Sequence, residues 1–337
     1  MDMKAYQLTA LNGPDALRLV ELPEPKPARG QVLVQVRAAS LNYRDLLVSD
    51  GRYGKLALPL IPLSDGAGEI VAVGEGVTRW KTGERVAGTF FQGWQAGPFQ
   101  GEMARTALGG ALNGMLAEYV ALSEDGVVPI PPHLGFEDAA TLPCAALTAW
   151  HALVIRGNVS ANETVLLLGT GGVSIFALQF AKMHGARVIV TSSSDEKLAR
   201  AKTLGADETI NYRSTPEWEM EAFHLTSEAG VDQVVEVGGA GTLVKSLRSV
   251  RPGGQVHLVG GVSGFTGEVP LAEIIRKLVV VRGIYVGSRA MFEALNRAVA
   301  LHRTKPVIDR VFEFTDAPGA YRYQQSGRHF GKIVISI

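Results

Sequence analysis

The stretch TVLLLGTGGVS, residues 164–174, places a glycine-rich turn between a short apolar strand and an apolar helix. The N–H groups that open a helix in this position bind phosphate readily. Gly169 permits the tight turn, Gly171 removes a side chain where a pyrophosphate approaches, and Ser174 is small enough for helix and strand to pack closely. This position favours dinucleotide binding over an ordinary glycine-rich connection. The residues expected to contact the dinucleotide are Gly169, Thr170, Gly171, Gly172 and Val173.

Helices and short apolar strands alternate after this turn. The segments RVIVTS (187–192), QVVEVGG (233–239) and QVHLVGG (255–261) are typical of buried strands, and helix-like residues separate them. This alternation predicts an α/β fold with a doubly wound parallel sheet that is covered on both faces. Ligands of such sheets lie outside the carboxyl ends of the strands. We therefore expect further cofactor contacts there, from Val237, Gly238, Gly260 and Gly261.

The end of the second strand indicates which dinucleotide binds. Enzymes that use NAD usually carry Asp or Glu about 20 residues after the first glycine, where the carboxylate accepts hydrogen bonds from the ribose. Serines occupy residues 192–194 here. A carboxylate would repel a 2′-phosphate, whereas the hydroxyls of Ser192 and Ser193 and the ammonium of Lys197 can donate to it. The sequence therefore favours NADP(H).

Three residues near this strand end each allow two interpretations. Asp195 either caps the following helix with its carboxylate or contacts the ribose. Lys197 either binds the 2′-phosphate or is a solvated charge on the helix. Tyr212, at the end of the predicted strand TINYR, either lies against the adenine or only packs there.

The remaining sequence defines a second domain. From residue 1 to about 125 the chain is rich in turns and strand-like segments, which indicates a β-domain, and residues 90–113 predict a long glycine-rich loop. We place the β-domain at residues 1–130, completed by residues 290–337, and the dinucleotide-binding domain at residues 131–289.

Composition excludes several classes of partner. The chain has 33 Lys plus Arg and 33 Asp plus Glu, which gives no electrostatic reason to expect nucleic acid or an anionic membrane. No run approaches the roughly 20 apolar residues of a membrane span. The N-terminus lacks the features of a signal peptide, and the single cysteine, Cys144, cannot form an internal disulfide. We therefore expect a cytoplasmic protein with a small-molecule substrate.

Several motifs together resemble the medium-chain dehydrogenase/reductase superfamily, and within it the zinc-independent, quinone oxidoreductase-like branch. The resemblance implies a GroES-like catalytic domain, a Rossmann domain and a nicotinamide cofactor held between them. The motifs are SLNYRDLLVSDGRYG (40–54), GAGEIVAVGEGV (66–77), AATLPCAALTAWHAL (139–153), the GTGGVS turn and GKIVI (331–335).

The resemblance also bears on metal binding. Zinc-dependent members of the superfamily bind their catalytic metal with a Cys, a His and a second Cys, and these positions fall on Asn42, Ser64 and Cys144. Neutral carboxamide and hydroxyl oxygens are poor zinc ligands. Residues 90–113, where those relatives carry a structural zinc lobe, contain no cysteine. We therefore expect no metal, and we interpret Cys144 as a small buried side chain rather than a ligand or nucleophile.

Without zinc, quinones and alkenes conjugated to a carbonyl become the favoured hydride acceptors. The resemblance places Asn42 beside the nicotinamide, where it would orient the ring amide or a substrate oxygen, and Asp45 would support this segment. Tyr53 is the expected donor to the substrate oxygen, because a phenol stays protonated at neutral pH, although it could also be a surface aromatic in a turn. Tyr43 and Arg44 could equally be solvent-facing or structural.

Four further cofactor contacts are implied by the resemblance. Thr148 would lie at the pyrophosphate, unless its hydroxyl bonds only to its own helical turn. Val286 and Ser288 belong to GIYVGSR (283–289), which would run past the nicotinamide as the last strand of the sheet and pair with a second subunit in a homodimer. Lys332 would either reach the cofactor or cap the sheet.

Three functions remain compatible with these residues. The first is an NADPH-dependent, zinc-free reductase of quinones or activated alkenes and carbonyls. The second is an NAD(P)-dependent alcohol dehydrogenase or carbonyl reductase. The third is a non-catalytic NADPH-binding sensor or a crystallin-like protein.

Overall fold

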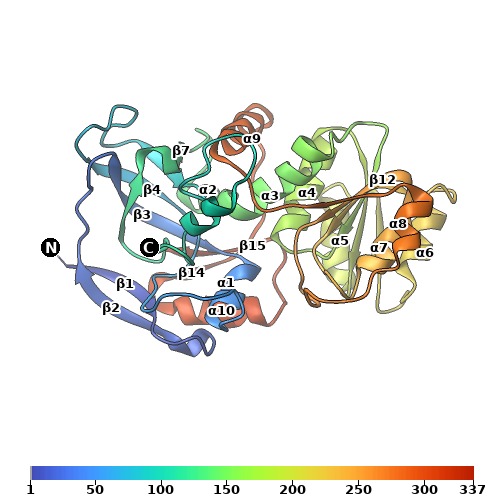
Figure 1. The fold of residues 1–337 in the computed structure, drawn as a ribbon, viewed down its shortest axis with the longest axis horizontal. Coiled ribbons are helices and arrows are strands. Elements are labelled where there is room, and N and C mark those ends of the chain that lie inside the picture. The colour runs from blue at the N-terminus through green and yellow to red at the C-terminus, as the bar shows by residue number, and fades with distance from the viewer. Residues whose placement is uncertain (1) are drawn as a thin grey trace. The chain divides into compact units, whose positions relative to one another are not determined.

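The computed structural model describes residues 2–337, which fold into two compact units (Figure 1). The first unit contains the residues up to Leu147 together with Val286–Ile337, and the second unit contains Thr148–Tyr285. No helix among the described residues is both long enough and apolar enough to cross a membrane.

The second unit is built on a six-stranded parallel sheet. The strands follow the order β10-β9-β8-β11-β12-β13, and every neighbouring pair is parallel. Strands β8, β9 and β11 are buried along nearly their whole length, as in a sheet covered on both faces. The predicted parallel α/β sheet is thus confirmed. The strands are β8 (Thr164–Leu168), β9 (Arg187–Ser192), β10 (Glu208–Asn211), β11 (Val231–Glu236), β12 (Val250–Leu258) and β13 (Val280–Gly283).

Apolar helix faces pack on this sheet. Helix α4 (Gly172–Met183), which follows the glycine-rich turn, buries Ile175, Phe176 and Leu178 and contacts strands β8 and β9. The other helices of the unit are α5 (Asp195–Thr203), α6 (Trp218–Leu225), α7 (Leu243–Ser249) and α8 (Leu271–Lys277), and α7 contacts both α6 and α8.

The edge strand of the sheet is shorter than the sequence predicts. Strand β13 ends at Gly283, so the expectation of a strand over residues 283–289 is wrong beyond its first residue. The backbone of Val286 has a φ of 49°, in the left-handed region that a strand cannot contain. Ser288 caps helix α9 (Arg289–His302), because its Oγ accepts a hydrogen bond from the Met291 N–H at 3.3 Å.

The first unit contains a seven-stranded sheet into which the C-terminal strand is inserted. The order is β14-β15-β3-β4-β5-β7, and β6 pairs with β3. Strand β15 (Lys332–Ser336) runs antiparallel to β3 (Gln31–Leu41), with Ile333 opposite Leu41. This register brings Lys332 to the end of β3. The other strands are β4 (Asp65–Val73), β5 (Arg85–Gly88), β6 (Tyr119–Ser123), β7 (Val127–Pro129) and β14 (Ile308–Glu313), and β1 (Asp2–Leu8) and β2 (Leu17–Pro23) form a separate antiparallel pair.

The first unit extends beyond residue 130, where composition suggested a boundary. Helix α2 (Phe136–Ala140) packs against strands β3, β4 and β15, which holds this segment to the first unit. A π-helical segment (Leu142–Ala146), helix α3 (Leu147–Trp150) and a second π-helical segment (His151–Arg156) follow. The remaining helices of the first unit are α1 (Tyr43–Ser49) and α10 (Ala317–Gln325).

One buried histidine makes the stability of the second unit depend on pH. His257 in β12 is fully buried, and its Nε2 lies 2.9 Å from Oε1 of Gln233 in β11. Burial lowers its pKa to about 4. Because the folded-state pKa lies below the unfolded value of about 6.5, the unfolded chain binds the extra proton first, and stability falls as the pH drops from 6.5 towards 4.

We expect this histidine to contribute up to about 3 kcal/mol of acid destabilisation, which His257→Gln should reduce. Urea unfolding of both proteins at neutral pH and at about pH 4.5 measures the effect. The exposed His224 on α6 offers a matched control, since His224→Gln should leave the pH dependence as it is in the wild type. Equal acid sensitivity in all three proteins would contradict the assignment.

Candidate active site and cofactor site

The glycine-rich turn between β8 and α4 has the geometry of a phosphate-binding turn. Gly169 has a φ of 73°, and a Cβ added to Gly169 or Gly171 would meet no protein atom within 4 Å. Both glycines therefore face open space. The Oγ of Ser174 donates to the carbonyl of Leu168 at 2.7 Å, which closes the helix onto the strand. No side chain caps the N-terminus of α4, so its first N–H groups are available to an anion. These residues fit the pyrophosphate of a dinucleotide.

Strand β9 ends beside this turn. The N–H of Gly169 donates to Thr191 Oγ1 at 3.3 Å, and the N–H of Tyr212 donates to the carbonyl of Ser192 at 3.0 Å. Ser192 is buried, whereas Ser193 and Lys197 are half-buried and Tyr212 is exposed. The structure thus gathers the predicted ribose-end and adenine-end residues at one edge of the sheet.

The N-cap of helix α5 is not Asp195, which was one of the two interpretations of that residue. Ser194 is the N-cap, since its Oγ accepts a hydrogen bond from the Lys197 N–H at 3.4 Å. Asp195 is the first helical residue, and its Oδ1 accepts a hydrogen bond from Asn211 Nδ2 at 2.7 Å. The interpretation of Asp195 as the cap is therefore wrong. A serine and an aspartate in adjacent positions are both good caps, so the sequence alone could not separate them.

A carboxylate that the sequence analysis missed lies under the end of β11. Glu236 is fully buried and accepts hydrogen bonds from the N–H groups of Gly238 and Gly239 at 2.7 and 2.9 Å. The hydroxyls of Thr242 and Ser246 also donate to it. Predicted contacts Val237 and Gly238 directly follow this residue, and Gly260 and Gly261 lie just beyond the end of β12. An acid at the end of a strand, separated by one residue from two glycines, was the available signal.

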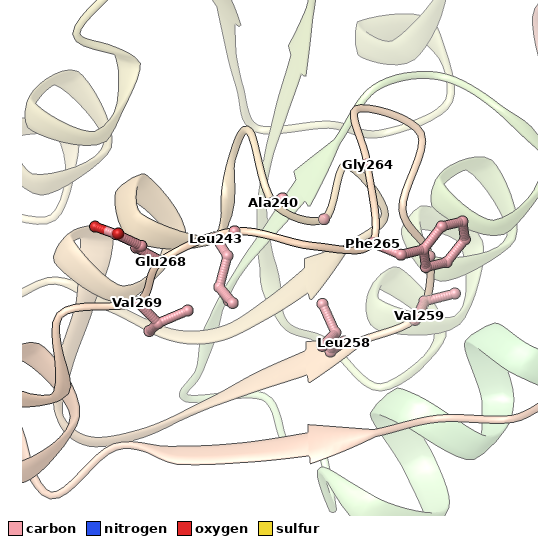
Figure 2. A pocket seen from close by; sticks show the side chains of 11 residues that line it. Ala240, Leu243, Leu258, Val259, Gly264, Phe265, Glu268 and Val269 are labelled. Atoms are coloured by element: carbon pink, nitrogen blue, oxygen red, sulfur yellow. The ribbon is translucent and has the colours of Figure 1, made fainter.

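An apolar pocket of about 310 Å³ opens beside these strand ends (Figure 2). Figure 2 shows the side chains of Leu243, Leu258 and Val269 converging from different elements. Phe265 is 71 % exposed at this pocket, and Glu268 is its charged residue. The lining residues are Gly239, Ala240, Leu243, Leu258, Val259, Gly260, Gly264, Phe265, Gly267, Glu268 and Val269.

In the first unit, Asn42 and Asp45 define the junction of β3 and α1. Asn42 is the N-cap of α1, and its N–H donates to Oδ2 of Asp45 at 2.7 Å. The other carboxylate oxygen of Asp45 lies 3.2 Å from Nη1 of Arg44, which also donates to the carbonyl of Leu108. Burial raises the pKa of Asp45 to about 6, and the Arg44 guanidinium opposes the shift. Asp45 therefore binds the backbone of the Asn42 segment, and its role in the site stays a prediction.

Arg44 is a structural residue and not a solvent-facing one. It is 8 % exposed, and its guanidinium carbon lies 4.5 Å from the centroid of the Tyr53 ring and 5.1 Å from that of Phe90. This contact holds the half-buried Tyr53 over the Asn42–Asp45 segment. Tyr43 packs against the core of the unit.

The three positions that bind zinc in zinc-dependent members lie close together in this chain. Ser64 Oγ donates to Oδ1 of Asp65 at 2.6 Å, and the Cys144 N–H donates to Oδ2 of Asp65 at 3.0 Å. Lys332 Nζ donates to Oδ1 of Asn42 at 2.7 Å and also to the carbonyl of Leu41. Ser64, Asp65 and Lys332 are buried, and Cys144 is half-buried.

The chemistry of this cluster does not fit a zinc ion. Burial raises the pKa of the Cys144 thiol, and the neighbouring Asp65 raises it further, so both disfavour the thiolate that zinc binds. An ammonium group, Lys332, already donates to the amide oxygen of Asn42, and a dication beside it would be repelled. Among residues 2–337 no group of three or more His, Cys, Asp or Glu side chains could hold a metal ion.

Four predicted cofactor contacts lie elsewhere in the two units. Thr148 is buried in helix α3 at the start of the second unit, and Val286 and Ser288 begin the C-terminal part of the first. Lys332 is 3 % exposed and contacts Asn42 within the first unit. Their roles towards a cofactor stay predictions.

Comparison with known proteins identifies the class of protein. Residues 28–132 match the alcohol dehydrogenase GroES-like domain, and residues 172–300 match the zinc-binding dehydrogenase domain. A zinc-type alcohol dehydrogenase-like protein of Schizosaccharomyces pombe is 43 % identical, over 97 % of each chain. An acryloyl-coenzyme A reductase of Metallosphaera sedula is 29 % identical over 94 % of this chain and 95 % of its own.

Structural comparison agrees with these matches. A crystal structure of an NAD-dependent alcohol dehydrogenase is 35 % identical, has a TM-score of 0.91, and is matched over 99 % of this chain and all of its own. The protein is therefore an oxidoreductase that uses a nicotinamide cofactor, NAD or NADP. It belongs to the medium-chain dehydrogenase/reductase superfamily.

Proposed function

We propose that this protein is an NADPH-dependent reductase that transfers hydride to a quinone or to an alkene or carbonyl activated by conjugation, without zinc. The observation that carries the proposal is the cluster of Asn42, Ser64 and Cys144, in which Lys332 donates to the Asn42 amide oxygen and Asp65 accepts from the Ser64 hydroxyl and from the backbone N–H of Cys144. A conjugated acceptor takes hydride without a Lewis acid. The similarity to an acryloyl-coenzyme A reductase supports this substrate class.

Each residue of the first-unit site has a defined role in this proposal. The Lys332 ammonium can only donate, so it fixes the Asn42 amide with its oxygen towards Lys332. This leaves the Nδ2 of Asn42 as the donor of the amide. Bound NADPH supplies the hydride. The Tyr53 hydroxyl stabilises negative charge that develops on the substrate oxygen, Asp45 holds the Asn42 backbone, and water supplies the proton.

Two other functions compete with this proposal. Relatives named alcohol dehydrogenase favour an NAD(P)-dependent alcohol dehydrogenase or carbonyl reductase. A non-catalytic NADPH-binding sensor or crystallin-like protein would keep the same cofactor turn. The single, half-buried cysteine is consistent with a reducing compartment, and we place the protein in the cytoplasm.

The purified protein with NADPH should reduce quinones or enones at least about tenfold faster than unconjugated aldehydes, about 1.4 kcal/mol of barrier. Loss of NADPH absorbance across a panel of quinones, enones, aldehydes and alcohols measures this. Preference for simple aldehydes or alcohols would favour the dehydrogenase. Binding of NADPH without turnover of any acceptor would favour the sensor.

A metal control accompanies the panel. Activity should persist in a chelator, and elemental analysis should find no stoichiometric zinc. Cys144→Ala should stay within a few-fold of the wild-type rate, because we assign the thiol a packing role. A drop of about a thousandfold with normal melting would show that Cys144 takes part in chemistry.

Cofactor preference is testable at the end of β9. The hydroxyls of Ser192 and Ser193 and the ammonium of Lys197 should favour NADPH over NADH by about 1–3 kcal/mol, the scale of one or two charge-assisted hydrogen bonds. Ser192→Asp should erase or reverse this preference. Ser160→Asp adds the same charge at an exposed position before β8 and serves as the control. Fluorescence titration decides, and a wild type that binds NADH equally well would refute the assignment.

We propose that the protein is a homodimer formed through β13. This strand is the edge of the sheet, with a single neighbouring strand, and its Val280 and Val281 are each more than a third exposed. The adjacent Ile275 and Leu278 are 68 % and 76 % exposed. An open edge flanked by apolar side chains is a template for a second strand. We expect a dimer in analytical ultracentrifugation that Val281→Lys weakens, while Val311→Lys on β14 has no effect. A wild-type monomer at micromolar concentration would contradict the proposal.

A further inference from the structure

Glu236, which the sequence did not predict as a site residue, binds several segments of the second unit through its carboxylate. Its Oε1 accepts hydrogen bonds from Gly238 N, Gly239 N and Thr242 Oγ1 at 2.7, 2.9 and 2.6 Å, and its Oε2 accepts one from Ser246 Oγ. The carboxylate is fully buried, and donors from the turn and from helix α7 surround it. A buried carboxylate with this set of donors fixes the backbone from which they come.

The glycines of this turn are required by the same arrangement. A Cβ on Gly238 would lie 2.2 Å from Thr242 Oγ1, and Gly239 has a φ of 84° with its Cβ position 2.4 Å from the carbonyl oxygen of Gly264. Only glycine lets the chain turn so closely around the carboxylate.

The backbone of Glu236 connects this turn to the end of β12. The carbonyl of Glu236 accepts the Val259 N–H at 2.8 Å, and the carbonyl of Gly238 accepts the Ser263 N–H at 2.7 Å. Ser263 Oγ also donates to Gly238 O and accepts from the N–H of Gly241. The two strand-end turns therefore form one hydrogen-bonded body, and Glu236 is at its centre.

The strand order determines which part of a dinucleotide meets this body. The phosphate-binding turn follows β8, and the ribose-end residues follow β9, on one side of β8. Strands β11 and β12 lie on the other side of β8. A dinucleotide that crosses the carboxyl edge of the sheet with its pyrophosphate at β8 places its nicotinamide half towards β11 and β12.

We propose that Glu236 is a positioning residue for the nicotinamide half of the cofactor, acting through the Val237–Gly239 and Val259–Gly261 turns. Its carboxylate holds both turns in the conformation that receives this half, while the adenosine half depends on β8 and β9. This inference rests on the proposed cofactor site.

The test compares two ligands on two variants. Adenosine 2′,5′-bisphosphate probes the adenosine half alone, and NADPH probes both halves. Glu236→Gln keeps the size and one acceptor oxygen but cannot accept at both positions. It should weaken NADPH binding about tenfold, the scale of one hydrogen bond to a charged group, raise the KM for NADPH, and leave the affinity for the bisphosphate unchanged. Ser246→Ala removes one donor and should shift the same quantities less.

Glu163→Gln provides the matched control. Glu163 stands directly before β8, at the opposite edge of the sheet, and its Oε2 accepts hydrogen bonds from Ser160 N and Gln233 Nε2. This variant should lose thermal stability without a change in either affinity. Equal weakening of both ligands by Glu236→Gln, or no weakening of NADPH, would overturn the inference. A wild type that binds neither NADPH nor NADH would instead refute the proposed cofactor site.

Discussion

A carboxylate withdrawn from water needs donors or a cation around it, and three such carboxylates hold the functional parts of this protein in place. Asp45 binds the N–H of Asn42 and the Arg44 guanidinium at the start of α1. Asp65 accepts hydrogen bonds from the Ser64 hydroxyl and from the backbone N–H of Cys144. Glu236 accepts hydrogen bonds from four donors at the strand-end turns of the second unit. In each case the geometry of the backbone near the site is set by the need to satisfy a buried charge.

Sequence reasoning predicted the features that depend on local pattern. The turn at residues 169–174 follows from its glycines and its place between a strand and a helix, and the parallel sheet follows from short apolar strands that alternate with helices. These signals are strong because neighbouring residues supply both the strand and the turn.

Features that depend on distant partners could not be predicted in this way. Lys332 meets Asn42 only because β15 pairs with β3 in one register, across 290 residues of sequence. The strand after β12 ends at Gly283, and Val286 then adopts a left-handed conformation, for which a valine gives no warning. The role of Glu236 depends on hydroxyls of helix α7 that are six and ten residues away.

The buried ammonium of Lys332 limits how the site can stabilise negative charge on a substrate. It donates a hydrogen bond to Asn42. Burial lowers the pKa of Lys332, whereas the negative charge of Asp65 raises it and so favours the protonated lysine. A fixed cation on a side chain orients a neighbouring amide, but it cannot accept an electron pair from a substrate oxygen as a metal does. In the proposed function the site relies on the donors Asn42 and Tyr53, which would stabilise a developing oxyanion more weakly than a metal ion does. Acceptors whose conjugation already delocalises the negative charge need less stabilisation of the oxyanion. The residues at the metal-ligand positions therefore favour the proposed substrate class.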